Sequence, residues 1–90
     1  MDKAHLEEVL EFIRQNRSNE GNFEILVKKL QEESSFEHNA EEYRQNLKEI
    51  ESKQVEEYRK HKETGGSAWP EFENFISRFE KTITEFLSKS

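Results

Sequence analysis

The three histidines are the first residues to consider for metal chemistry. His5, His38 and His61 are widely separated, and no pair has the His-x-x-x-His spacing that places two imidazoles on one helix face beside a zinc ion. His38 with Glu42, and Glu57 with His61, have the four-residue spacing of neighbours on a helix face. Such pairs are typical of a solvated polar face. We predict no metal site and no cofactor.

Catalytic motifs are equally sparse. The chain has no cysteine, no Gly-x-Ser-x-Gly sequence, and a single Gly65–Gly66 pair in place of a phosphate-binding loop. Its 20 acidic residues supply many carboxylates. Acid–base catalysis, however, needs a pair held in a partly desolvated pocket, and a chain with 31% hydrophobic residues has little interior in which to form one. We therefore predict a protein that is not an enzyme, with no catalytic residue and no small-molecule substrate.

The charge balance argues against two further classes of partner. Twenty acidic and 14 basic residues give a net charge of -6, which disfavours binding to nucleic acid or to an anionic membrane. The basic cluster Arg59–Lys62 stands near an expected helix C-terminus, where cations complement the helix dipole. An alternative remains open, an acidic nucleic-acid mimic or a nucleic-acid-associated regulator acting through charged helix faces. Lys and Arg alternate with Glu even in the densest stretch, residues 41–63, whereas mimicry needs rows of carboxylates.

Apolar residues recur with the three- and four-residue spacing of amphipathic helices along the whole chain. We predict an all-α fold in one domain, residues 1–90: a small antiparallel bundle of about four helices. The expected helices cover residues 2–17, 22–33, 36–63 and 68–88. The Gly65–Gly66 pair ends the long third helix, and Pro70 fits the first turn of the fourth. These two helices are expected to form a hairpin.

The third helix has a seam of the coiled-coil type. Ser34–Glu37 has the form of a capping box, which predicts a start near residue 36, and Asn39–Glu42 offers a second start. Alternating steps of four and three residues define the seam, at Phe36, Ala40, Tyr43, Leu47 and Ile50. Gln54 occupies the next seam position, while Val55 and Tyr58 are shifted around the helix. The shift indicates either a coiled-coil stutter or the end of the buried seam.

The last helix has the strongest apolar pattern. Its stripe consists of Trp69, Phe72, Phe75, Ile76, Phe79, Ile83, Phe86 and Leu87. Such a stripe is typical of a helix packed into a core. The first two helices carry short apolar faces that could cover about half of it, so the remainder would need a partner surface. The candidate partner-binding residues are Trp69, Phe72, Phe75, Phe79 and Phe86, followed by Tyr43 and Tyr58, which we expect to be exposed on the third helix.

Together these patterns predict a non-enzymatic helical module for protein–protein interaction: an inhibitor, an adaptor or an assembly subunit. We expect a protein partner, self-association into a homo-oligomer, or both. The residues after Met1 are charged and resemble no signal peptide, and no apolar run is long enough to span a membrane. We therefore expect a cytoplasmic protein without membrane contact. No motif connects the chain to a family.

Overall fold

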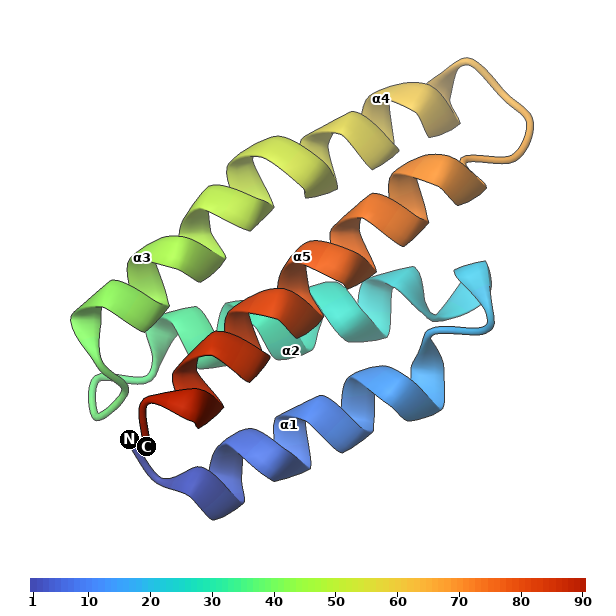
Figure 1. Ribbon diagram of the computed structural model, residues 1–90. Coiled ribbons are helices and arrows are strands. Elements are labelled where there is room, and N and C mark those ends of the chain that lie inside the picture. The colour runs from blue at the N-terminus through green and yellow to red at the C-terminus, as the bar shows by residue number, and fades with distance from the viewer.

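Four helical rods follow one another along the chain, and each runs antiparallel to the one before it (Figure 1). The computed structural model describes residues 1–90 and contains no strand, so the predicted all-α bundle is confirmed. Its elements are α1 (Lys3–Asn16), the 3₁₀ turn η1 (Glu20–Asn22), α2 (Phe23–Ser35), α3 (Glu41–Ile50), the π-helical turn η2 (Glu51–Val55), α4 (Glu56–Glu63) and α5 (Trp69–Ser88). No helix is both long and apolar enough to cross a membrane.

The elements α3, η2 and α4 form one continuous rod, called the α3–α4 rod below (Figure 1). Helix α5 packs against this rod and against α1, while α2 packs against α3. The two chain termini therefore meet at one end of the bundle, the terminal end, together with the turn between α2 and α3 (Figure 1). The opposite end, called the loop end, contains η1 and the turn between α4 and α5.

The aromatic stripe of α5 lies in the centre of the bundle. Seven residues of α5 are buried: Phe72, Phe75, Ile76, Phe79, Thr82, Ile83 and Phe86. All of them except Thr82 join a hydrophobic core cluster to which every long helix contributes. The accessible surface of the chain is 5476 Å², close to the value of about 5,500 Å² expected for a folded monomer of this mass. The expectation that α1 and α2 leave half of the stripe uncovered is therefore wrong.

The π-helical turn explains the phase shift in the apolar pattern after Ile50. In an uninterrupted α-helix a residue five positions on lies about 140° around the axis, so Val55 would face away from the core. The wider η2 turn takes up the additional residue, and Ile50, Val55 and Tyr58 remain buried at 5%, 2% and 6% exposure. The buried seam continues past Ile50 into α4.

The long rod begins at Glu41, five residues later than the expected start near residue 36. Ser34 does not cap a following helix, because its hydroxyl donates to the carbonyl of Gln31 within α2. The chain then turns, held by buried Asn39, whose side-chain amide donates to the carbonyl of Glu33 over 2.9 Å. Phe36 consequently lies in the turn with 49% of its surface exposed, outside the seam that the sequence predicted.

The turn between α4 and α5 agrees with the predicted glycine turn. Gly65 and Gly66 have φ angles of 88° and 83°, the left-handed region that suits glycine at a helix C-terminus. Pro70 lies in the first turn of α5, where an N–H has no partner in the helix. The hydroxyl of Ser67 accepts a hydrogen bond from the Trp69 N–H over 3.3 Å. The turn therefore directs the start of α5.

Candidate functional site

The residues predicted to bind a partner lie in two different environments. Six of the seven are buried within the chain: Phe72, Phe75 and Phe79 completely, Phe86 almost so, and both tyrosines of the long rod. The expectation that Tyr43 and Tyr58 are exposed is wrong. Trp69 alone keeps a large exposed surface, 39% of the residue. It is also the only tryptophan in the chain.

Each tyrosine is buried with its hydroxyl donating to a carboxylate from another element. Tyr43 donates to Glu33 over 2.9 Å, and Tyr58 donates to Glu20 over 2.9 Å. Burial disfavours the phenolate, and the adjacent carboxylate disfavours it further. The pKa of Tyr58 is therefore raised to about 12, and that of Tyr43 lies well above its ordinary value. Both rings serve the fold as neutral donors.

Glu20 connects the two turns of the loop end. Its Oε2 accepts hydrogen bonds from the Lys62 ammonium over 2.8 Å and from the Tyr58 hydroxyl, while Oε1 accepts from the Ser67 hydroxyl over 3.3 Å. The hydrogen bond from Lys62 and then that from Tyr58 lower the pKa of the Glu20 carboxyl. Glu20 therefore joins η1 to α4 and to the segment before α5.

The exposed Trp69 ring is continuous with an aromatic cluster beneath it. Trp69 contacts Phe72 at 5.4 Å between ring centroids, and Phe72 lies 6.4 Å from Tyr58. The Tyr58 ring stacks on the Phe23 ring with 3.7 Å between centroids. The Arg59 guanidinium lies over the Phe23 ring, 5.6 Å from its centroid. These five residues carry apolar surface from the core to the exterior of the loop end.

A shallow hollow lies beside this cluster. It is lined by Glu20, Gly21, Phe23, Glu24, Tyr58, Lys62, Gly66 and Ser67. Ala68 connects the last two of these residues to Trp69. The exposed indole and the hollow thus occupy the same end of the bundle, on a framework that Glu20 holds together.

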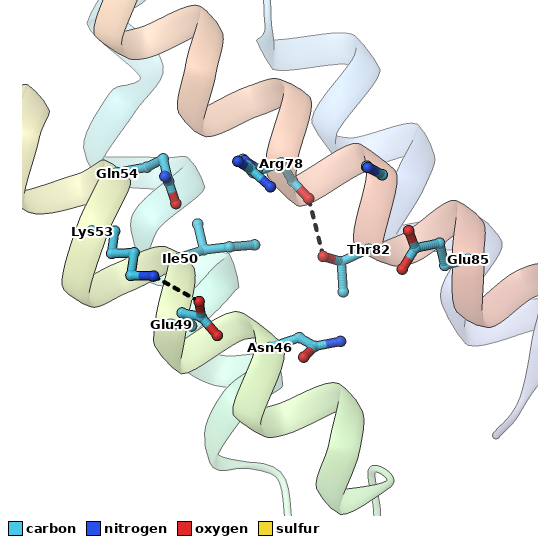
Figure 2. Close-up of a pocket in the computed structure, with 9 residues that line it drawn as sticks. Asn46, Glu49, Ile50, Lys53, Gln54, Arg78, Thr82 and Glu85 are labelled. Carbon is cyan, nitrogen blue, oxygen red and sulfur yellow. Dashed lines mark hydrogen bonds and ion pairs between the residues drawn. The ribbon is translucent and has the colours of Figure 1, made fainter.

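A second concave surface lies between the α3–α4 rod and α5, and Figure 2 shows it in close-up. It has a volume of about 210 Å³ and is lined by Asn46, Glu49, Ile50, Lys53, Gln54, Arg78, Lys81, Thr82 and Glu85. We call it the polar groove. The Lys53 ammonium donates to the Glu49 carboxylate over 2.9 Å (Figure 2). That hydrogen bond and the charge of Lys53 lower the pKa of Glu49, with a smaller contribution from Arg78.

A buried carboxylate joins three helices near the terminal end. Glu33 is 4% exposed. His5 Nε2 lies 2.9 and 2.8 Å from its two oxygens, and Tyr43 donates to one of them. The Glu33 carboxylate thus links α1, α2 and α3. Buried charges are tolerated when they are paired and hydrogen-bonded in this way.

The histidines lie in three separate places. His5 contacts Glu33, the His38 ring packs against Phe36, and His61 Nδ1 lies 3.0 Å from Glu71 Oε1. His38 belongs to the turn before α3, so the helix face that it was expected to share with Glu42 does not exist. No group of three or more metal-ligating side chains converges on one point.

Sequence reasoning missed Glu20 and Glu33 as organising residues. Both are ordinary glutamates in helical sequence, and their partners His5, Tyr43, Tyr58 and Lys62 are between 10 and 42 positions away. No local pattern marks such contacts. Comparisons of the chain with family models, with curated proteins and with solved structures found no match.

Proposed function

We propose that this protein is a non-enzymatic protein-binding module that contacts its partner through the loop end, with Trp69 as the anchor. One observation supports this proposal above the others. Trp69 is 39% exposed, while the other aromatic residues of α5 are buried in a core that a single chain closes. Tryptophan is enriched among the few residues that dominate binding energy at protein interfaces.

The surroundings of Trp69 suit an anchor because they are ordered before binding. The indole of Trp69 packs against the Phe72 ring. The backbone N–H of Trp69 donates to the Ser67 hydroxyl, and that hydroxyl donates to the Glu20 carboxylate. Lys62 and Tyr58 hold Glu20 from the other side. A rigid aromatic side chain loses little conformational entropy on association, so more of its contact energy appears as affinity.

The proposed partner is a different protein, because the closed core removes the reason for expecting a second copy to cover the aromatic stripe. The exposed rim of the loop end carries both signs of charge, with Glu24 paired to Arg59 at 3.1 Å and Glu20 to Lys62 at 2.8 Å. A polar, solvent-accessible rim around an apolar centre is typical of protein interfaces. The mixture of positive and negative charges on this rim supports protein binding over nucleic-acid mimicry, because mimicry needs an uninterrupted row of carboxylates.

A paired capture experiment tests the proposal. The wild-type chain, Trp69→Ala and Phe36→Ala are immobilised separately, and proteins retained from an extract of the source cells are compared. Phe36 is the matched control, because it is an exposed aromatic residue at the terminal end, 49% exposed. A partner retained by the wild type and by Phe36→Ala, but lost by Trp69→Ala, supports the proposal.

Two further measurements make the result decisive. Thermal unfolding of both variants shows whether each remains folded, so that loss of capture cannot be a loss of structure. A salt titration of the complex then separates the classes of function. A contact through Trp69 should change little between low and high salt, whereas a charge-based contact should weaken steeply. Retention that is indifferent to Trp69 and steeply salt-dependent would contradict the proposal.

A further inference from the structure

The polar groove presents hydrogen-bond donors from both of its walls. Arg78 and Lys81 project from α5, and the amides of Asn46 and Gln54 project from the α3–α4 rod (Figure 2 labels three of the four). None of these four side chains forms a hydrogen bond or an ion pair within the chain, although other cations such as Lys62 do. The donor capacity of these four side chains is therefore unused, whereas Lys53 in the same lining is paired with Glu49.

The charge of the groove differs from that of the molecule. Glu49 is already engaged by Lys53 at 2.9 Å, which leaves Glu85 as the carboxylate in the lining without an ion pair. Lys53, Arg78 and Lys81 outnumber Glu49 and Glu85 by one charge, whereas the whole chain has a net charge of -6. The groove is thus a locally cationic site on an acidic protein.

We propose that the polar groove binds a phosphate group. The Arg78 guanidinium and the Lys81 ammonium supply charge-assisted hydrogen bonds from one wall. Gln54, which faces Arg78 across the groove (Figure 2), supplies a neutral donor from the other wall. Asn46 lies eight residues before Gln54, about 12 Å along the rod, and marks the other end of the groove. Donors on opposite sides match a tetrahedral anion with several acceptor oxygens better than a planar carboxylate. The volume of about 210 Å³ accommodates a phosphate group with the atoms that carry it.

The backbone around the groove gives a reason for its shape. The π-helical turn η2 supplies Lys53 and Gln54 to the lining and ends the regular α3 helix at Ile50, which lies in the groove wall. Single π-helical turns often occur at functional sites, because the additional residue reorients neighbouring side chains. This inference is independent of Trp69, which lies at the loop end and contributes nothing to the groove lining.

A titration of the full chain with inorganic phosphate, followed by ¹H–¹⁵N NMR at constant ionic strength, tests the inference. Saturable shifts should concentrate in residues 46–54 and 78–85. Arg78→Gln and Lys81→Gln should each weaken the affinity by about tenfold, because each removes one charge-assisted contact. Lys28→Gln is the matched control, since Lys28 is an exposed cation of α2 without an ion pair, and it should change the affinity less than twofold.

A parallel titration with acetate distinguishes the phosphate group from carboxylates, and it should give affinity at least tenfold weaker. The inference is overturned by shifts that rise linearly and spread over the surface, by equal effects of the Lys28 and Arg78 variants, or by acetate binding as tightly as phosphate. Trp69→Ala should leave phosphate binding unchanged. The groove and the proposed protein-binding surface can therefore fail separately.

Discussion

Ile50 and Val55 are five residues apart, and both face the core because the π-helical turn η2 lies between them. A five-residue step in an α-helix would rotate Val55 about 140° away from Ile50. The wider turn corrects the phase and carries Tyr58 into the core as well, where its hydroxyl reaches Glu20. The order of the loop end therefore depends on an irregular turn in the middle of the long rod.

Deleting one residue of η2 should be tolerated better than deleting one residue of regular helix. Removal of the exposed Ser52 changes the step between Ile50 and Val55 to four residues, which an α-helix keeps on one face. Removal of the exposed Lys48 shortens the step between Leu47 and Ile50 from three residues to two, and an α-helix does not keep residues two apart on one face. Urea denaturation should show a loss of about 1 kcal/mol for the first deletion and more than about 3 kcal/mol for the second. Equal losses would contradict the phase argument.

Trp69 and Phe75 should respond differently to truncation, although both belong to the aromatic stripe of α5. Phe75 is fully buried, so Phe75→Ala leaves a cavity and should lower the free energy of unfolding by about 3–5 kcal/mol. Trp69→Ala removes a partly exposed ring and should cost about 1 kcal/mol. Chemical denaturation of both variants measures the difference. If Trp69→Ala were as destabilising as Phe75→Ala, the indole would be a core residue.

Stability should fall at alkaline pH as Tyr58 ionises. Its pKa is raised to about 12 in the folded protein, above the ordinary value of about 10, so the folded state favours the neutral phenol. The contribution of Tyr58 to the free energy of unfolding is therefore fully present below about pH 10, and it is lost as the pH rises towards about 12. Tyr58→Phe should show a shallower loss of unfolding free energy between about pH 9 and 12. Tyr43 contributes to the loss that remains in this variant.

The Glu20 carboxyl should produce the opposite dependence at acid pH. Its pKa is lowered by Lys62 and Tyr58, so its contribution is present above the ordinary pKa of a glutamate and disappears as the pH falls through the folded value. Glu20→Gln should therefore be less acid-sensitive than the wild type in thermal unfolding between about pH 5 and 3. An unchanged acid slope would mean that the Glu20 contacts contribute nothing to stability in solution.

The buried Glu33 contacts should be costly to break. Tyr43→Phe removes the hydroxyl that donates to this carboxylate, and we expect a loss of about 1–3 kcal/mol in the free energy of unfolding. His5→Gln should also destabilise, because His5 Nε2 contacts both oxygens. His38→Gln is the control: His38 is exposed and its change should stay within about 0.5 kcal/mol. Equal effects of the two histidine variants would contradict a role for the Glu33 contacts.

Much of the fold follows from local rules. Helical periodicity predicts the four rods, and the Gly65–Gly66 pair and Pro70 predict the last turn, because these features depend on neighbouring residues alone. The path after Ile50 could not be predicted in the same way. The same residues are compatible with a stutter, with the end of the seam or with a π-helical turn, and packing against α5 decides among them.

The candidate site was harder to predict than the fold. Periodicity shows that the α5 stripe is apolar, but the area that α1, α2 and the long rod cover depends on their three-dimensional packing. Tyr43 and Tyr58 appeared exposed because their polar partners, Glu33 and Glu20, are remote in sequence. Of the seven candidate partner-binding residues, Trp69 alone is exposed in the folded chain. Its distinction from the buried phenylalanines required the structure.

We propose that Trp69 anchors a partner protein at the loop end, and calorimetric titration of the captured partner measures the contribution of this residue to binding. The affinities of the wild type, Trp69→Ala and Phe36→Ala are compared at one salt concentration. We predict that Trp69→Ala weakens binding by about 30-fold, as loss of a hot-spot residue does, and that Phe36→Ala changes it less than about twofold. Equal affinities for all three chains, or a greater loss with Phe36→Ala, would contradict the claim.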